Sequence, residues 1–131
     1  MKNSIMSVLI VESASKCSKI EELLDNQYQC IASYGHIREV KEIKDNLKCI
    51  YKIINHKAVK NMREVIKNAT EVILATDDDR EGESIAWHIC DVFSLNIKTT
   101  KRIIFREITR EALQRAIKNP TTIDMNIVEA Q

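Results

Sequence analysis

The sequence predicts a three-layer α/β domain in which helices cover both faces of a mostly parallel sheet. Short apolar runs, typical of strands buried on both faces, alternate along the chain with segments of helical periodicity. The length of 131 residues fits one domain with a core of its own. Apolar residues make up 44% of the chain and occur along its whole length, which excludes a disordered protein.

Runs rich in branched apolar residues are expected to form the strands. The first, residues 5–11, is nearly continuous in Ile, Leu and Val. The others lie at residues 29–33, 49–54, 71–75 and 102–105. We expect the charged segment 38–48 to be a surface loop between the second and third strands.

Apolar residues spaced three and four apart predict helices between these strands. The expected helices lie at residues 15–26, 58–69, 85–93 and 109–118. Thr109 is a good N-cap for the last of these, and Asn119-Pro120 stops it. Residues 122–131 resemble the opening of a further helix.

Charge and cysteine usage limit the kinds of protein that this sequence can encode. Twenty lysines and arginines against 19 acids give a net charge of +1, so no bulk charge indicates nucleic acid or a membrane. The four cysteines form no CxxC pair, which disfavours a zinc site and indicates buried thiols in a reducing, intracellular compartment. The first apolar run contains Ser7 and meets Glu12 too early for a secretion signal, and we expect no membrane span.

Glycine is unusually rare. At the average frequency of about 7%, a chain of this length would carry on the order of nine glycines, but it has two, Gly35 and Gly82. Each is therefore expected to mark a backbone requirement, such as a positive φ or a close approach of the main chain.

Acidic residues follow two of the predicted strands. Glu12 comes directly after the first strand, and Asp77 follows the strand at 71–75 with only Thr76 between. In open α/β sheets the ligand crevice lies at the carboxyl ends of the strands, so these acids converge if the two strands are neighbours. Five acids and one arginine give the loop at residues 77–83 a charge of −4, which is unfavourable unless something neutralises it.

Mg²⁺ is the natural neutraliser, because it prefers carboxylate oxygens. Asp77 and Asp79 project to the same side of an extended segment, whereas Asp78 projects to the other and is a poorer ligand. Glu81 and Glu83 lie where the next helix begins, and carboxylates there also stabilise the helix dipole. The expected metal ligands are Glu12, Asp77, Asp79 and Glu81, with helix capping at least as good an interpretation of Glu83.

Cations beside such a site suit phosphoryl transfer. Lys16 follows Glu12 by four positions, and Arg80 lies within the acidic loop. In phosphoryl transfer, positioning and charge neutralisation supply most of the catalysis. An acidic DxD pattern is weak by itself, but a buried strand before it, a glycine within it and a lone glutamate after another strand strengthen it.

Several segments together resemble the Toprim domain of type IA DNA topoisomerases. They are Glu-Ser-Ala-Ser-Lys at 12–16, Ser-Tyr-Gly-His-Ile-Arg-Glu at 33–39, and Ala-Thr-Asp-Asp-Asp-Arg-Glu-Gly-Glu at 75–83, which continues into Ile-Ala-Trp-His at 85–88. Their order and spacing also match. Residues 105–109 and 128–131 resemble the segments that lead out of that domain, so the resemblance covers essentially the whole chain.

The resemblance implies a Rossmann-like Toprim domain at residues 1–120, with 121–131 opening a helix toward gate domains that the chain lacks. It implies an enzyme in which a tyrosine cleaves one DNA strand, holds the break as a 5′-phosphotyrosine link and reseals it after strand passage. The implied cofactor is Mg²⁺. The implied partners are a single-stranded DNA segment and the remaining topoisomerase domains in cis, in a monomeric intracellular protein located with the DNA.

The resemblance also implies roles for individual residues. Glu12 would give or take a proton near the leaving sugar oxygen, and Lys16 and Arg80 would contact the scissile phosphate. The metal acids would be Asp77, Asp79 and Glu81. Gly35 would allow the turn before His36, which we interpret as a structural, hydrogen-bonding histidine.

The sequence departs from the family pattern in two ways. Ala14 stands where the family usually has proline, which removes no functional group. The tyrosines Tyr28, Tyr34 and Tyr51 do not match the context of the nucleophile, which lies in a later domain of the family. We therefore expect this chain to be inactive in strand passage by itself.

Two other functions remain open. A stand-alone Toprim nuclease would use Glu12 and the acidic loop with two metals to activate water, although residues 105–109 argue against it. An Mg²⁺-dependent receiver module would also gather acids at strand ends. Receivers, however, place their paired acids after the first strand, which is the reverse of the order found here.

Overall fold

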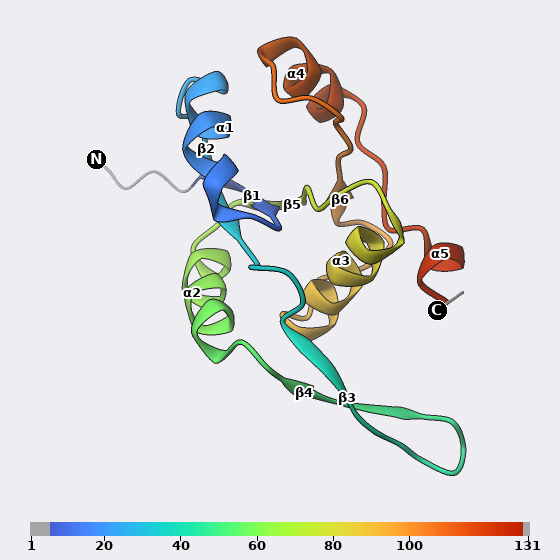
Figure 1. Ribbon diagram of the computed structural model, residues 1–131. Coiled ribbons are helices and arrows are strands. Elements are labelled where there is room, and N and C mark those ends of the chain that lie inside the picture. Colours follow the sequence, from blue (N-terminus) through green and yellow to red (C-terminus); the bar gives the residue numbers. More distant parts are fainter. Residues whose placement is uncertain (1–5, 130–131) are drawn as a thin grey trace.

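Helices cover both faces of a central sheet in the computed structural model, which describes residues 6–129 (Figure 1). Helices α1 (Cys17–Leu23) and α4 (Arg110–Lys118) lie on one face, and α2 (His56–Lys67) and α3 (Arg80–Val92) lie on the other. The predicted three-layer α/β class is confirmed. The central sheet is mostly parallel, as predicted.

The order of the four strands explains where a ligand can bind. Along the sheet they are β2 (Tyr28–Ala32), β1 (Ser7–Val11), β5 (Glu71–Leu74) and β6 (Lys101–Arg102). All three neighbouring pairs are parallel. The chain therefore runs from β1 to β2 on one side and later returns to β5 on the other, which creates a topological switch point between β1 and β5.

Strand β1 is buried on both faces, as its apolar run predicts. Val8 and Ile10 pack in the cluster under α2 and α3, whereas Leu9 and Val11 pack in the cluster under α1 and α4. Successive side chains of a strand point to opposite faces, so one short run serves two cores. The predicted start of this strand, Ile5, lies outside the described residues.

The last strand is shorter than expected. β6 ends at Arg102 instead of Phe105, although the Ile103 N–H still donates to the Leu74 carbonyl at 2.9 Å. On its outer side Arg102 forms an isolated antiparallel bridge with Thr121. The segment after α4 thus returns to the sheet edge.

The charged segment 38–48 was expected to be a surface loop, and the structure corrects this. Residues Arg38–Ile43 form β3, which pairs antiparallel with β4 (Cys49–Ile53) as a hairpin separate from the central sheet. Figure 1 shows this hairpin extending away from the body of the domain. A register shift between Val40 and Glu42 breaks the alternation of apolar and polar residues, so the strand pattern is hidden in the sequence.

Two helices begin at side-chain caps, of which Thr109 was predicted and Asn55 was not. The Asn55 side chain accepts from the Ala58 N–H at the start of α2, and Thr109 accepts from the Ala112 N–H at the start of α4. A 3-10 turn, η1 (Ala14–Lys16), precedes α1. None of the helices within residues 6–129 is long and apolar enough to cross a membrane.

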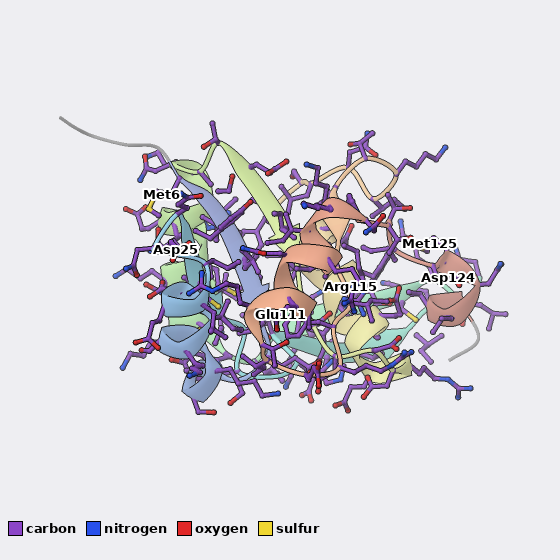
Figure 2. The ribbon with its side chains drawn as sticks, turned by 90° about the horizontal axis from the view of Figure 1, so that it is seen from above. Met6, Asp25, Glu111, Arg115, Asp124 and Met125 are labelled. Atoms are coloured by element: carbon purple, nitrogen blue, oxygen red, sulfur yellow. The ribbon has the colours of Figure 1, made fainter. Side chains whose placement is uncertain are left out.

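The end of the chain packs back on the body. Ile123 is buried in the cluster under α2 and α3, and α5 (Met125–Glu129) lies against α3. Figure 2 shows Asp124 and Met125 at the start of α5, on the opposite side of the molecule from Asp25 at the end of α1. Glu111 and Arg115 lie along α4 in the same view.

The cysteines were expected to be buried thiols, and this holds for two of the four. Cys30 and Cys90 are buried, whereas Cys17 and Cys49 are partly exposed, and all four are free. Burial raises the pKa of the Cys90 thiol to about 11.

Candidate active site at the carboxyl edge of the sheet

The switch point brings Glu12 and Asp77 together. Glu12 follows β1 and Asp77 lies just beyond β5, and the two strands are parallel neighbours. Glu12 Oε1 accepts a hydrogen bond from the Asp77 N–H at 2.8 Å. The convergence predicted from the two strand ends is therefore present.

Several groups around Glu12 shift the pKa of its carboxyl. Burial raises the pKa of the Glu12 carboxyl above its usual range, and the charges of Asp77, Asp79 and Glu81 raise this pKa further. The hydrogen bond from the Asp77 N–H acts in the opposite direction. Three of the acids that the sequence singled out therefore act electrostatically on Glu12.

The acidic loop turns directly into α3. Asp79 is the N-cap of this helix, and its Oδ1 accepts from the Gly82 N–H at 2.6 Å. Helix α3 begins at Arg80, which is exposed, so Glu81 stands in the first turn as expected. The capping role of Asp79 uses one carboxylate oxygen.

Gly82 is required where the loop approaches the helix. A Cβ atom at this position would lie 1.9 Å from the Asp77 carbonyl oxygen, a distance that no side chain tolerates. The Thr76 hydroxyl also donates to the Gly82 carbonyl at 2.7 Å. The expected close approach of the main chain is confirmed for this glycine.

The fully buried Arg102 supports the acidic loop. Arg102 pairs through its Nε with Glu83, and both side chains are buried. The two terminal nitrogens of the guanidinium donate to the carbonyls of Thr76 and Asp77 at 2.9 and 2.8 Å. Glu83 also accepts from the Asp124 N–H at 2.9 Å, so its carboxylate is committed to a buried network that the sequence did not reveal.

A second arginine binds the loop from the surface. Arg106 donates to Asp78 Oδ2 at 2.7 Å. Asp78 thus binds Arg106, in agreement with the prediction that its side chain projects away from those of Asp77 and Asp79. Arg106 also lines a small pocket of about 70 Å³ together with Glu12, Lys16 and Asp77. Lys16 therefore lies at the same edge as the two convergent acids.

Gly35 and His36 lie between β2 and β3, where His36 approaches Glu81. Gly35 has a φ of +83°, which confirms that this glycine serves a left-handed turn. His36 Nε2 lies 3.6 Å from Glu81 Oε2. The histidine thus contacts one of the candidate metal acids.

The hairpin is fastened to α3 by Arg38. Its Nε donates to His88 Nδ1 at 2.8 Å, another of its nitrogens pairs with Asp91, and its guanidinium lies 4.3 Å from the centre of the Tyr51 ring. Burial, followed by the charge of Arg38, lowers the pKa of His88 to about 4. His88 is therefore a neutral acceptor at physiological pH.

The donor chemistry of the edge suits Mg²⁺. Among residues 6–129, no group of three or more His, Cys, Asp or Glu side chains is arranged to hold a metal ion. The carboxylates of Asp77, Asp79 and Glu81 nevertheless lie near enough to raise the pKa of Glu12. Oxygen ligands of this kind, on a loop and a helix start, match the preference of Mg²⁺ for carboxylates and water.

Two arginines that hold the acidic loop in place were not predicted to do so. Arg102 was placed in the last strand as an ordinary residue, and Arg106 was noticed only for its resemblance to a family segment. An arginine inside an apolar strand run is a usable sign, because a buried guanidinium requires partners.

Comparison with known proteins agrees with the geometry. The Toprim domain family matches residues 7–108. The structure of full-length topoisomerase I from Thermotoga maritima is similar, with a TM-score of 0.83 and 36% sequence identity over 95% of this chain. The match covers 22% of that topoisomerase, so this chain spans about a fifth of its length. The chain belongs to the Toprim domain family.

Proposed function

We propose that this chain is the Mg²⁺-binding Toprim domain of a type IA DNA topoisomerase, which cleaves and reseals one DNA strand through a 5′-phosphotyrosine link. One observation carries the proposal: the Glu12 carboxylate rests on the Asp77 N–H at the switch point, within the field of three further carboxylates. The 36% identity with a topoisomerase I supports it. The acids follow the strands in the order expected of this family and not of receivers.

Glu12 would move the proton. A carboxyl whose pKa is raised toward the working pH is a better general acid and base than an ordinary glutamate. It would protonate the leaving sugar oxygen during cleavage and accept that proton during resealing. Lys16, in the same pocket, and Arg80, at the start of α3, would hold the scissile phosphate.

Asp77, Asp79 and Glu81, together with Glu12, would hold Mg²⁺. When bound, the ion would neutralise charge around the phosphate. Asp79 caps α3 through Oδ1, and its other carboxylate oxygen is the one that would face the ion.

The rest of the enzyme would lie outside this domain. Residues 1–120 would form the Toprim domain, and 121–131 would lead toward further domains in cis that carry the tyrosine. The substrate would be a single-stranded DNA segment, bound by a monomeric, intracellular protein.

The metal is tested by titrating Mg²⁺ against thermal stability. An ion that binds only the folded form raises the melting temperature. Asp77→Asn with Asp79→Asn should abolish the rise, and asparagine at position 79 still caps the helix. Asp78→Asn is the matched control, because Asp78 pairs with Arg106, and should leave the rise intact. A full rise in the double variant would refute the ligand assignment.

The reaction class is tested on negatively supercoiled plasmid with Mg²⁺. The 131-residue chain should leave the plasmid unchanged, because strand passage needs a tyrosine and a gate. A ladder of topoisomers that stops when Tyr28, Tyr34 or Tyr51 is changed to Phe would contradict the proposal. Nicked or linear DNA that depends on Glu12 would establish the nuclease alternative instead.

A further inference from the structure

Tyr34 occupies an unusual position beside the candidate site. Its side chain is 61% exposed, so it contributes little to either core. Its backbone has a φ of +60°, in the left-handed region that costs a residue with a Cβ atom energy and that glycine adopts freely. An exposed aromatic ring kept in a strained backbone is explained poorly by folding and well by binding.

The backbone of Tyr34 is anchored to Glu12. The Tyr34 N–H donates to the Glu12 carbonyl at 3.0 Å, and the neighbouring Ser33 N–H donates to the Val11 carbonyl at 2.8 Å. The turn after β2 thus continues the hydrogen bonding of β1 and β2 past the strand ends. These bonds place the backbone of Tyr34 next to that of Glu12, the residue that would handle the proton.

Tyr34 lines a pocket of about 380 Å³ with residues from the start of α2. The other lining residues are Asn55, Lys57, Ala58 and Asn61. Asn55 Oδ1 accepts from the Ala58 N–H at 3.0 Å, which fixes the orientation of this amide. The pocket therefore combines an aromatic face, two amides and an ammonium group.

Helix α2 adds positive charge to this side of the domain. It carries Lys57, Lys60, Arg63 and Lys67 against the single acid Glu64, a net charge of +3 from four cations and one anion. The acidic loop at residues 77–83 carries −4. A polyanion that contacts the acidic loop at one point would therefore also be attracted to the cations along α2.

We infer that the pocket of Tyr34, Asn55, Lys57 and Asn61 binds a nucleobase of single-stranded DNA, at a nucleotide flanking the phosphate held beside Glu12. Tyr34 stacks on the base, the two amides bind its polar edge, and Lys57 contacts a phosphate. Aromatic stacking accepts every base, because each has a π-face, so this subsite holds the strand without selecting a sequence. The inference rests on the proposed function, since it deepens the account of the DNA substrate.

The test uses short single-stranded DNA oligonucleotides, each with 2-aminopurine at one position, titrated into the 131-residue chain. Stacking on Tyr34 quenches the fluorescence of the base at the position that enters the pocket. Tyr34→Gly should weaken binding by about 5- to 150-fold and abolish this quenching. Tyr34→Phe keeps the ring and should bind within twofold of the wild type.

Tyr34→Gly is chosen because glycine adopts the left-handed backbone without strain. Its melting temperature should stay within a few degrees of the wild type, which separates lost binding from lost folding. Binding of Tyr34→Gly within twofold of the wild type would overturn the subsite, and so would a wild type with no quenched position.

Lys16→Ala separates the subsite from the proposed function. Weaker binding in Lys16→Ala but not in Tyr34→Gly would keep the proposed phosphate site and reject the base pocket. Weaker binding in Tyr34→Gly but not in Lys16→Ala would keep the pocket and reject the phosphate contact. Absence of any binding by the wild type would reject both.

Discussion

Replacing Arg102 should destabilise the domain and loosen the acidic loop together. The side chain is fully buried and pairs with the buried carboxylate of Glu83. Removing one partner of a buried pair leaves the other charge uncompensated and typically costs about 3–5 kcal/mol. A domain with a total stability of about 5–15 kcal/mol would barely survive Arg102→Ala.

Arg102→Lys is therefore the informative change. It keeps the positive charge beside Glu83, but an ammonium group cannot reproduce the planar fork that reaches the carbonyls of Thr76 and Asp77. The buried Thr76 carbonyl and the partly buried Asp77 carbonyl would lose their donors, and each unsatisfied buried group costs about 1–3 kcal/mol. Part of this is recovered by relaxation, so we expect a loss of about 1–3 kcal/mol in total.

The matched control is Arg106→Lys. Arg106 also binds the acidic loop, through Asp78, but its side chain is 85% exposed, and exposed pairs contribute about 0–1 kcal/mol. Urea unfolding can be followed through the fluorescence of Trp87, the single tryptophan of the chain. Equal stabilities of Arg102→Lys and Arg106→Lys would refute the argument. It would also fail if a double-mutant cycle of Arg102→Lys with Glu83→Gln showed no coupling.

Three further outcomes are expected. Gly82→Ala should lower the melting temperature and reduce its rise with Mg²⁺, because the new Cβ would displace the Asp77 carbonyl; an unchanged rise would contradict this. The buried His88, with its pKa lowered to about 4, makes the domain lose on the order of 1–3 kcal/mol as pH falls from 6.5 to 4. Over that interval the unfolded state binds the proton and the folded state does not. His88→Gln, which keeps an acceptor for Arg38, should flatten this part of the urea-unfolding profile, and an equally steep profile would argue against it. Binding of single-stranded DNA should weaken steeply with salt and further without Mg²⁺, as measured by anisotropy, and tight metal-free binding in high salt would oppose this.

The sequence predicts the framework of the fold well because its pattern is local. The run at residues 5–11 and the cap at Thr109 act within a few residues, and sequence patterns detect such effects. Strand β4 was predicted at residues 49–54, but β3 was missed because the register shift near Lys41 removes the alternation that marks a strand. Its residues are largely exposed, so no hydrophobic pattern compensates.

The candidate site was predicted in part. Glu12 and Asp77 each follow a predicted strand, so they were expected to meet if the two strands are neighbours. The parallel pairing of β1 with β5 meets that condition. The support beneath the loop could not be predicted, because Arg102 and Glu83 are nineteen positions apart and meet only through the packing of α3 on β6. Long-range pairing of charges has no local pattern.

This support divides the acids of the loop into two sets with different tasks. Glu83 pairs with the buried Arg102 and Asp78 pairs with the exposed Arg106, and these two pairs hold the loop in place. Asp77, Asp79 and Glu81 are the acids whose charges raise the pKa of Glu12. The first set therefore carries the structure of the loop, whereas the second concentrates negative charge where a metal ion would neutralise it. Neutralising Glu83 should destabilise the domain at any Mg²⁺ concentration, because its partner Arg102 is buried, whereas neutralising Asp78 removes only a pair with the exposed Arg106 and should change stability little. Neutralising the second set should relieve repulsion among the acids and lower the pKa of Glu12, and a loss should appear only when the ion or DNA is present. This difference separates structural from functional acids within a single seven-residue segment.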